Sequence, residues 1–250
     1  MDDSCLFLQL YSLRHEIGLA AEDTIRRVPG LGFDGVELAG DYGWPVERWR
    51  AILLETGLSV VALHAGLEAL ETNLSERVAF ARALGTNTFV VPAVAKSLQN
   101  KAGYHEAARR LNAIGRALTE EGFTLGYHNH AFEFVRLEPG SPTCGMDILL
   151  AETEPHLVHF EFDTFWLEYA GHSAVEFIRR HASRVFFIHA KDFRKRDRED
   201  VPAGVGDVDF PALLALCTAN GWQVILEYEN NHALEAVRRG AAYLRPLLSR

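Results

Sequence analysis

Cysteine is scarce in this chain. Three cysteines, Cys5, Cys144 and Cys217, are spread over 250 residues, and no CxxC motif is present. An odd number of widely separated cysteines argues against a disulfide framework. We therefore expect reduced, buried cysteines and a cytoplasmic protein.

Positive charge is also in short supply. Lysine and arginine together number 25 against 34 aspartates and glutamates, which gives a net charge of -9 and a pI near 5.7. A protein that follows a nucleic-acid backbone needs a basic face. The composition thus predicts no nucleic-acid partner, although a few local cations could still hold a small anionic substrate.

Long apolar runs, linkers and low-complexity segments are missing as well. No apolar stretch approaches the roughly 18 residues that a membrane span needs. The N-terminal "MDDSCLFLQLYSLRHE" begins with acids, where a signal peptide would carry a basic region. We expect no membrane partner, and the absence of a break in composition predicts one domain over residues 1–250.

What the chain does contain is one repeated pattern: an amphipathic stretch, a glycine and a short apolar run. The glycines are Gly32, Gly57, Gly85, Gly122 and Gly221. Each stands where the C-terminus of a helix needs a left-handed residue. The apolar runs that follow, such as "TNTFVV" and "WQVILEY", have the length and composition of strands. The stretches before them, such as "YHEAARRLNAIGRALTEE", carry apolar residues at helical spacing.

This pattern predicts eight strands separated by helices. The expected strands are Leu6–Tyr11, Gly35–Leu38, Ser59–His64, Thr88–Pro92, Thr124–His128, Val158–Asp163, Val185–His189 and Gln223–Tyr228. Strands joined by helices pair in parallel, and eight such units match a closed (β/α)8 TIM barrel. An open doubly wound sheet is the rival, but no GxGxxG follows the first strand. The long stretch Asp192–Asp207 is expected to be irregular, as a lid, a binding loop or a solvated loop.

Each expected strand is apolar until its end and then turns polar. In a barrel of this kind chemistry sits at the C-terminal ends of the strands. The polar residues there are Glu37, His64, His128, His130, Asp163, His189, Lys191, Glu227 and Glu229. Because residues two apart on a strand share a face, one ring at the barrel mouth is expected to hold His128, Asp163, His189 and Glu227.

That ring indicates a metal site. A single histidine at a strand end is more often a hydrogen-bonded rim residue than a ligand, but four polar ends on neighbouring strands are improbable without a function. Imidazole and carboxylate together suit one divalent cation, such as Mn²⁺, Mg²⁺, Co²⁺ or Zn²⁺.

Motifs along nearly the whole chain resemble the sugar phosphate isomerase/epimerase family of xylose-isomerase-like barrels. They are "LQLYSLR", "GFDGVELAG", "GLSVVALHAGLE", "LGYHNHAFEF", "MDILLAETEPHLVHFEFDTFW", "VFFIHAKDF", "GVGDVDFPALL" and "VILEYEN". The family includes ketose 3-epimerases, isomerases, inosose dehydratase and a branch of DNA-repair endonucleases. The resemblance implies a metal held by an acid from the fifth strand and by Asp163, His189 and Glu227 from the next three.

The fifth strand departs from this family pattern. Epimerases carry a glutamate at the position of His128, and a similar Tyr-His-x-His run marks the inosose dehydratase branch. His128, His130 and Glu133 are alternatives for the ligand from this strand.

The resemblance implies a sugar or sugar phosphate isomerase/epimerase that removes a proton next to a carbonyl, with the metal stabilising the enediolate. Glu227 is the expected base as well as a ligand, and His128 or His130 would be the opposing acid. Lys191 would steady the developing oxyanion or pair with Glu229.

The remaining polar and aromatic residues of the mouth would meet the substrate. Glu37, His64, Trp166 and Glu229 are the expected substrate-binding residues. The "GVGD" turn at residues 204–207 is either a phosphate site before a helix or a plain turn.

Three other interpretations remain open at this stage. An inosose-dehydratase-like lyase, or an enzyme that cleaves keto-glycosides, would begin with the same proton removal. A metal-dependent endonuclease of the same fold would need a basic face, which the net charge of -9 opposes. A sugar-binding barrel without catalytic activity would keep its ligand affinity after Asp163→Asn and Glu227→Gln, and its wild type would show no turnover. The expected partner is a small sugar or keto-sugar, and the sequence leaves open whether the chain forms a homo-oligomer.

Overall fold

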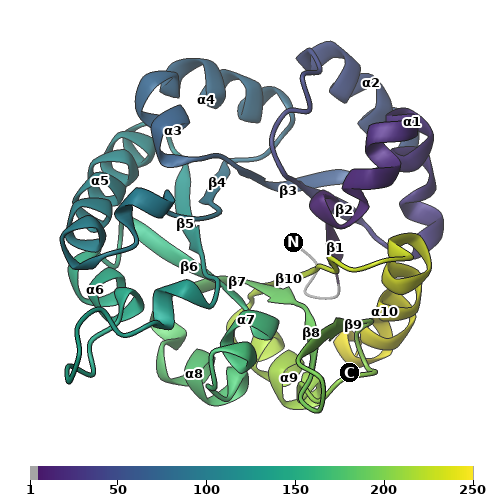
Figure 1. Cartoon of the computed structure of the whole chain (residues 1–250). Coiled ribbons are helices and arrows are strands. Elements are labelled where there is room, and N and C mark those ends of the chain that lie inside the picture. Colours follow the sequence, from purple (N-terminus) through teal and green to yellow (C-terminus); the bar gives the residue numbers. More distant parts are fainter. Residues whose placement is uncertain (1–4, 250) are drawn as a thin grey trace.

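Eight parallel strands close into a barrel. The computed structural model describes residues 5–249, and within that range the strand order is β1-β10-β7-β6-β5-β4-β3-β2 (Figure 1). The strands are β1 (Leu6–Gln9), β2 (Gly35–Leu38), β3 (Ser59–His64), β4 (Thr88–Val91), β5 (Thr124–His128), β6 (Val158–Asp163), β7 (Val185–Ala190) and β10 (Gln223–Leu226). The expected (β/α)8 barrel is therefore confirmed.

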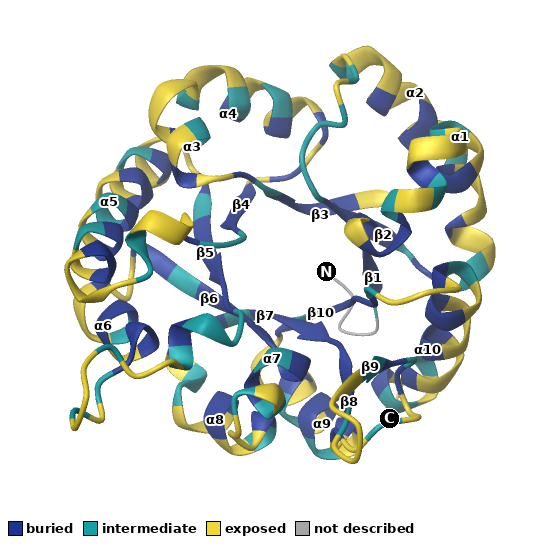
Figure 2. Cartoon of the chain, in the orientation of Figure 1, coloured by how far each residue is buried: buried dark blue, intermediate teal, exposed yellow. Residues whose placement is uncertain are grey.

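Helices surround the barrel, with their inner faces buried and their outer faces exposed (Figure 2). They are α1 (Arg14–Arg27), α2 (Val46–Thr56), α3 (Leu67–Thr72), α4 (Leu74–Ala83), α5 (Lys101–Glu120), α6 (Gly145–Glu152), α7 (Thr164–Tyr169), α8 (Ala174–Arg180), α9 (Phe210–Asn220) and α10 (Ala233–Leu248). On α5 the buried Leu111, Ile114 and Leu118 form one stripe at helical spacing. No helix in residues 5–249 is long and apolar enough to span a membrane.

The glycines of the repeated pattern have the backbone conformation that their positions require. All five lie at positive φ, from 68° at Gly221 to 102° at Gly32. Gly57, for example, caps α2 and donates its N–H to the carbonyl of Leu53. This region of φ is costly for residues with a Cβ, so glycine ends these helices where the next strand must begin.

Three strands end earlier than expected, and the first two are β1 and β4. The first strand stops at Gln9, because the side-chain oxygen of Gln9 accepts the N–H of Tyr11 and Leu10–Leu13 turn into a 3-10 helix. β4 stops at Val91, since Pro92 has no N–H to donate to a neighbouring strand.

The last strand also ends early, at Leu226. Beyond it the N–H of Tyr228 donates to Oγ of Ser12 at 3.0 Å, and the N–H of Glu229 donates to Oδ2 of Asp200 at 2.6 Å. These two N–H groups bond to side chains, so the chain leaves the ladder there. β7, in contrast, continues one residue past the expected end, to Ala190.

The prediction of an irregular stretch after the seventh strand is wrong in its first half. β8 (Asp192–Arg194) and β9 (Glu199–Val201) form an antiparallel hairpin that projects at the barrel mouth (Figure 1). Arg198 makes its tight turn with a φ of 59°. The hairpin brings residues of a long connection back towards the strand ends.

The "GVGD" turn after this hairpin is built around the carboxylate of Asp192. That carboxylate accepts hydrogen bonds from the N–H groups of Phe193, Gly204, Gly206 and Val208, at 2.8 to 3.2 Å. These are the groups that a phosphate would need. Of the two alternatives for the turn, the structure shows the plain turn.

Side chains inside the barrel are apolar towards one end and polar towards the other. The apolar layer consists of Phe7, Val61, Ala62, Val90, Phe187 and Ile225. Two residues further along three of these strands come Gln9, His189 and Glu227. Because alternate residues of a strand share a face, the same geometry that fills the barrel interior carries these polar groups to its mouth.

We predict that Asp192→Asn lowers the free energy of unfolding by about 2 kcal/mol, because an amide offers one acceptor oxygen and turns its NH₂ towards backbone donors. Urea denaturation would measure the change. Asp197→Asn on the exposed hairpin is the control and should change the midpoint little. Equal midpoints for the two variants would contradict the role given to Asp192.

Candidate functional site

Some residues of the run "GYHNHAFEF" stabilise the fold, and others lie at the candidate site. Gly126 leaves room for the rings inside the barrel, since a Cβ there would collide with the side chain of Phe186. Tyr127 donates its hydroxyl to Oε1 of Glu133 at 2.7 Å, and the N–H of His130 donates to Oε2 of Glu133 at 2.8 Å. Glu133 therefore anchors the turn after β5. It belongs to none of the clusters of metal-binding type in residues 5–249.

The next residues of the run face the mouth. His128 is buried among the strand ends, and Oδ1 of Asn129 accepts the N–H of Asp163 at 3.0 Å. The ring of His130 stacks on Phe132 and lies 5.2 Å from the ring of Trp166. Burial lowers the pKa of His130 to about 3, which keeps its imidazole neutral.

One carboxylate oxygen joins three histidines below the mouth. Oε2 of Glu161 lies 3.0 Å from Nδ1 of His128, 3.0 Å from Nε2 of His189 and 3.1 Å from Nε2 of His64. Burial alone would raise the pKa of Glu161, but the charge of His189 and the hydrogen bonds from the histidines hold it well below its usual range. Because an ionised carboxylate only accepts, Nδ1 of His128 carries a proton and its Nε2 keeps a lone pair.

Glu37 supports His189 from the same side. Oε2 of Glu37 lies 2.7 Å from Nε2 of His189 and accepts a hydrogen bond of 2.7 Å from the amide of Gln9. With two carboxylates facing Nε2, the other ring nitrogen, Nδ1, faces Glu227 at 3.3 Å and Asp163 at 4.0 Å. Carboxylates behind an imidazole fix its orientation in this way at metal sites.

Four buried donors from neighbouring strands converge at the mouth. They are His128, Asp163, His189 and Glu227, and one ligand atom of each lies within 4.8 Å of the others. A second group of four, with His64 and Glu161 in place of Asp163 and Glu227, meets the same distance. In that group the carboxylate oxygen already contacts three imidazoles, so the first group is the better candidate.

Asp163 provides the test of whether a cation fits the first group. Its Oδ1 accepts the N–H of Trp166 at 3.0 Å and so caps α7, while its buried Oδ2 has no hydrogen-bond partner within residues 5–249. Burial raises the pKa of Asp163 well above its usual range. A divalent cation would supply both the charge and the partner that this oxygen lacks, so the donor set fits such an ion.

Lys191 is a buried cation among carboxylates. Its Nζ bonds to Oε1 of Glu229 and lies 3.5 Å from Oε2 of Glu227. Burial alone would lower the pKa of Lys191, but Glu227 and Asp163 raise it above its usual range, so the ammonium stays charged. The pair with Glu229 that the sequence offered as one alternative is present.

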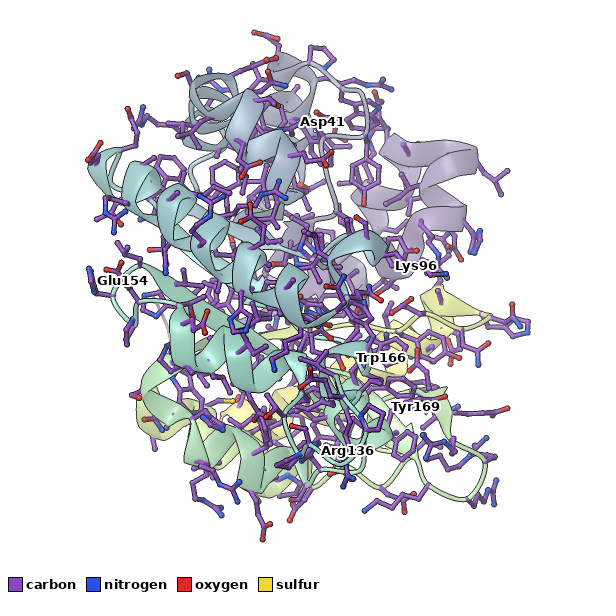
Figure 3. All side chains as sticks on the ribbon, turned by 60° about the vertical axis from the view of Figure 1, so that its left-hand side comes forward. Asp41, Lys96, Arg136, Glu154, Trp166 and Tyr169 are labelled. Carbon is purple, nitrogen blue, oxygen red and sulfur yellow. The ribbon has the colours of Figure 1, made fainter. Side chains whose placement is uncertain are left out.

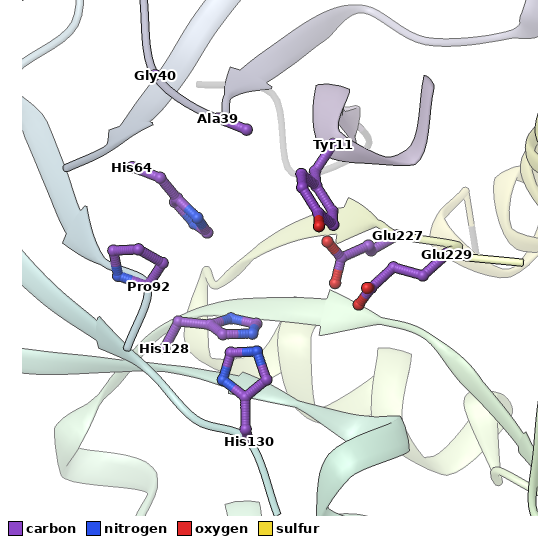
Figure 4. Close-up of a pocket in the computed structure, with 9 residues that line it drawn as sticks. All are labelled: Tyr11, Ala39, Gly40, His64, Pro92, His128, His130, Glu227 and Glu229. Carbon is purple, nitrogen blue, oxygen red and sulfur yellow. The ribbon is translucent and has the colours of Figure 1, made fainter. Parts of the chain in front are cut away.

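The strand ends open onto a hollow of about 320 Å³. It is lined by Tyr11, Ala39, Gly40, His64, Pro92, His128, His130, Glu227 and Glu229. Figure 4 shows Glu227, Glu229 and Tyr11 on one side and the three histidines on the other. A molecule in this hollow would lie between carboxylates and imidazoles, the arrangement needed to take a proton on one side and give one on the other.

Not every residue expected to bind the substrate lines this hollow. His64 and Glu229 do, whereas Glu37 lies beneath it, buried against the histidines. Trp166 lines a neighbouring hollow together with Lys191.

Sequence reasoning missed four residues of this region: Gln9, Tyr11, Glu161 and Asp200. Glu161 had a signal, because it lies two residues before Asp163 and so shares its face of β6. Asp200 had none, since its place depends on the hairpin.

The sequence model of the family described as xylose isomerase-like TIM barrel matches residues 25–247. Among curated proteins, an inosose dehydratase of Clostridium perfringens is 25% identical in an alignment 253 positions long, which covers 85% of this chain and 84% of that protein.

Two solved structures show the same fold. A sugar phosphate isomerase/epimerase from Parabacteroides distasonis has a TM-score of 0.84 at 22% identity and covers 97% of this chain and 94% of its own. A probable 3-DHS dehydratase involved in petrobactin synthesis from Bacillus anthracis has a TM-score of 0.77 at 16% identity, with 96% and 98% covered. At these identities the likeness establishes the fold alone.

Burial raises the pKa of Glu133 to about 8, against about 4.3 for an exposed glutamate. Between these values the folded chain holds a proton that the unfolded chain has lost, so the free energy of unfolding falls as pH rises. We predict that Glu133→Gln makes this free energy less dependent on pH. Urea unfolding at about pH 5.5 and about pH 7.5 would measure the slope.

The control for that slope is Glu138→Gln. Glu138 is an exposed glutamate paired with Lys101, and its replacement should leave the slope of the wild type. If the free energy of unfolding of Glu133→Gln depended on pH as strongly as that of the wild type, the buried carboxyl of Glu133 would not be the source of this dependence.

Proposed function

This chain belongs to the xylose isomerase-like TIM barrel family, and we propose that it is a metal-dependent lyase acting on a small keto-sugar or keto-cyclitol. The reaction begins with removal of the proton next to the carbonyl and ends with loss of the neighbouring oxygen substituent. The observation that carries the proposal is the buried group of His128, Asp163, His189 and Glu227 beside a hollow with carboxylates and imidazoles on opposite sides.

His128, Asp163, His189 and Glu227 would hold one divalent ion. When bound, such an ion polarises a carbonyl and makes the neighbouring C–H more acidic. Within the chain, Nε2 of His128 is kept available by the bond from its Nδ1 to Glu161. His189 is oriented in the same manner by Glu37 and Glu161.

Glu227 is the base in this proposal. It is a carboxylate that lines the hollow and lies 3.5 Å from the ammonium of Lys191. Burial alone would raise the pKa of Glu227, but Lys191 and His189 hold it well below its usual range, so Glu227 is present as an ionised carboxylate. Glu229 lies beside it, and Lys191 bridges the two glutamates.

His64 is the acid on the opposite side. Burial alone would lower its pKa, but Glu37 and Glu161 raise it to about 10, so His64 lines the hollow as an imidazolium. The carbon-bound proton passes to Glu227, the electron pair forms a carbon–carbon double bond, and the C–O bond on the next carbon breaks. The leaving oxygen takes a proton from His64, which gives an unsaturated ketone and water.

Two further observations support this choice. The curated relative from Clostridium perfringens is an inosose dehydratase that spans most of this chain. No lysine or arginine of residues 5–249 lines the hollow of about 320 Å³, which favours a substrate without a phosphate group.

Epimerisation or isomerisation is the second candidate. The arrangement of Glu227 opposite the imidazolium of His64 also suits return of a proton to the other face of the same carbon or to the next carbon (Figure 4). The structural neighbour from Parabacteroides distasonis bears the name of that activity.

Protein purified without chelator is predicted to contain about one divalent ion per chain by elemental analysis. Asp163→Asn keeps the shape of the side chain but removes a negative charge from the donor set, and it should lose about tenfold or more in metal affinity. Asp209→Asn, at the N-cap of α9, is the control and should retain the ion. A wild-type protein that takes up no ion even with added Mn²⁺ or Zn²⁺ would rule out the metal site.

In D₂O, the wild type is predicted to place deuterium on carbon in an inosose or in D-fructose, as seen by NMR. Glu227→Gln should slow this exchange by about 10² to 10⁴-fold, because an amide cannot accept the proton. Glu138→Gln serves as the control. Loss of one water from the inosose, detected by mass spectrometry, would identify the lyase.

Deuterium in an epimer or isomer without loss of water would instead identify the second candidate. If the metal-loaded wild type shows neither deuterium exchange nor loss of water, both candidate reactions are ruled out.

A further inference from the structure

A second hollow of about 180 Å³ lies beside the first. Its lining is Phe165, Trp166, Lys191, Asp200, Glu229 and Asn230. Glu229 lines both hollows, and the ring of Trp166 lies 5.2 Å from that of His130, which lines the first. Figure 3 shows Trp166 and Tyr169 towards one side of the barrel and Glu154, which precedes β6, towards the other. The second hollow thus extends the reactive one at the mouth.

Two of the residues that line this hollow each carry a buried polar atom without a hydrogen-bond partner. Within residues 5–249, neither Nε1 of Trp166 nor Oδ1 of Asp200 has a hydrogen bond. The indole nitrogen can only donate, and the carboxylate oxygen accepts. Since buried polar groups are nearly always paired, a donor and an acceptor left unpaired on two residues that line one hollow indicate a ligand with hydroxyl groups, which can both donate and accept.

Both residues are held in place by their other contacts. Oδ2 of Asp200 accepts the N–H of Glu229 at 2.6 Å, which fixes the carboxylate on β9 against the end of β10. The backbone N–H of Trp166 donates to Asp163, and its ring packs edge-on against Phe165 at 4.8 Å. The orientation of the two unpaired atoms is therefore set by the fold before any ligand arrives.

The charges that line the hollow disfavour an anionic ligand, since they comprise two acids, Asp200 and Glu229, and one cation, Lys191. The ammonium of Lys191 is bonded to Glu229 and close to Glu227, so it is not free to pair with an anionic group of a ligand. What the hollow offers a ligand is aromatic surface from Trp166 and Phe165, whose ring centroids lie 5.1 and 5.2 Å from the ammonium of Lys191, together with the unpaired donor and acceptor. The amide of Asn230 also lines it. A neutral sugar ring matches these groups, because its C–H face packs on aromatic rings and its hydroxyls bond at the edge.

We propose that this hollow is a subsite for a second sugar ring, so that the substrate is a keto-sugar joined to another neutral, hydroxylated ring. The first ring would occupy the hollow of about 320 Å³ beside Glu227, and the second would lie on Trp166 with hydroxyls bonded to Asp200 and to the indole N–H. The identity of the first ring rests on the proposed function. The subsite itself rests only on the second hollow and its unpaired atoms.

The test compares one ring with two. D-fructose and four ketose disaccharides that differ in linkage (turanose, leucrose, isomaltulose and lactulose) would be titrated into the metal-loaded protein by calorimetry. At least one disaccharide should bind the wild type about tenfold more tightly than D-fructose. In Trp166→Phe, which loses the N–H, and in Asp200→Asn, which replaces an acceptor with a donor, this ratio should fall towards about one.

Tyr169→Phe is the matched control, since Tyr169 lies on α7 near Trp166 but lines neither hollow; it should keep the wild-type ratio. The subsite would be overturned if no disaccharide bound the wild type more tightly than D-fructose, or if both subsite variants kept the ratio. If the wild type binds a disaccharide more tightly than D-fructose but shows no deuterium exchange, the subsite is supported and the proposed reaction is ruled out. The two failures are therefore distinguishable.

Discussion

The contact of one carboxylate oxygen with three imidazoles is the constraint on which the mouth of this barrel depends. Oε2 of Glu161 lies 3.0 to 3.1 Å from nitrogens of His64, His128 and His189. A buried, ionised carboxylate demands donors, so each histidine must present an N–H to it. The opposite ring nitrogens of His128 and His189 are thereby turned towards Asp163 and Glu227. A single buried charge thus decides how two candidate ligands are oriented.

The mouth as a whole holds more acids than cations. Glu37, Glu161, Asp163 and Glu227 are buried within a few strand ends of one another, while Lys191 is the buried ammonium among them. So many carboxylates in a place of low dielectric need positive charge, from protons or from a metal ion. The raised pKa of Asp163 and its unpaired Oδ2 locate where that charge is missing. The electrostatics and the donor geometry therefore point to the same position.

Beyond the strand ends, the long connection after β7 shapes the site. Asp192 uses its carboxylate to bind backbone N–H groups and so fixes the turn that closes the hairpin region. β9 then carries Asp200 to the N–H of Glu229. The hairpin in this way adds a polar group and an aromatic-walled hollow beside the reactive one. A segment without conspicuous motif residues thus contributes to what the barrel can bind.

The sequence by itself determined the barrel, the strand order along the chain and the polar ring. Alternation with a period of two places Phe187 and His189 on one face whatever the surroundings, so the residues that meet at the mouth follow from local pattern. It could not reveal the contacts between strands, because these depend on register. The ladder between β6 and β7 shifts between Phe160 and Glu161, which aligns Glu161 with Phe187 and Asp163 with His189. Only the tertiary structure made Glu161 the partner of three histidines and brought Asp200 to the site, because these contacts join segments that are far apart in the sequence. It also made Glu133 an anchor for the turn after β5, because the path of that turn is not encoded in the local pattern.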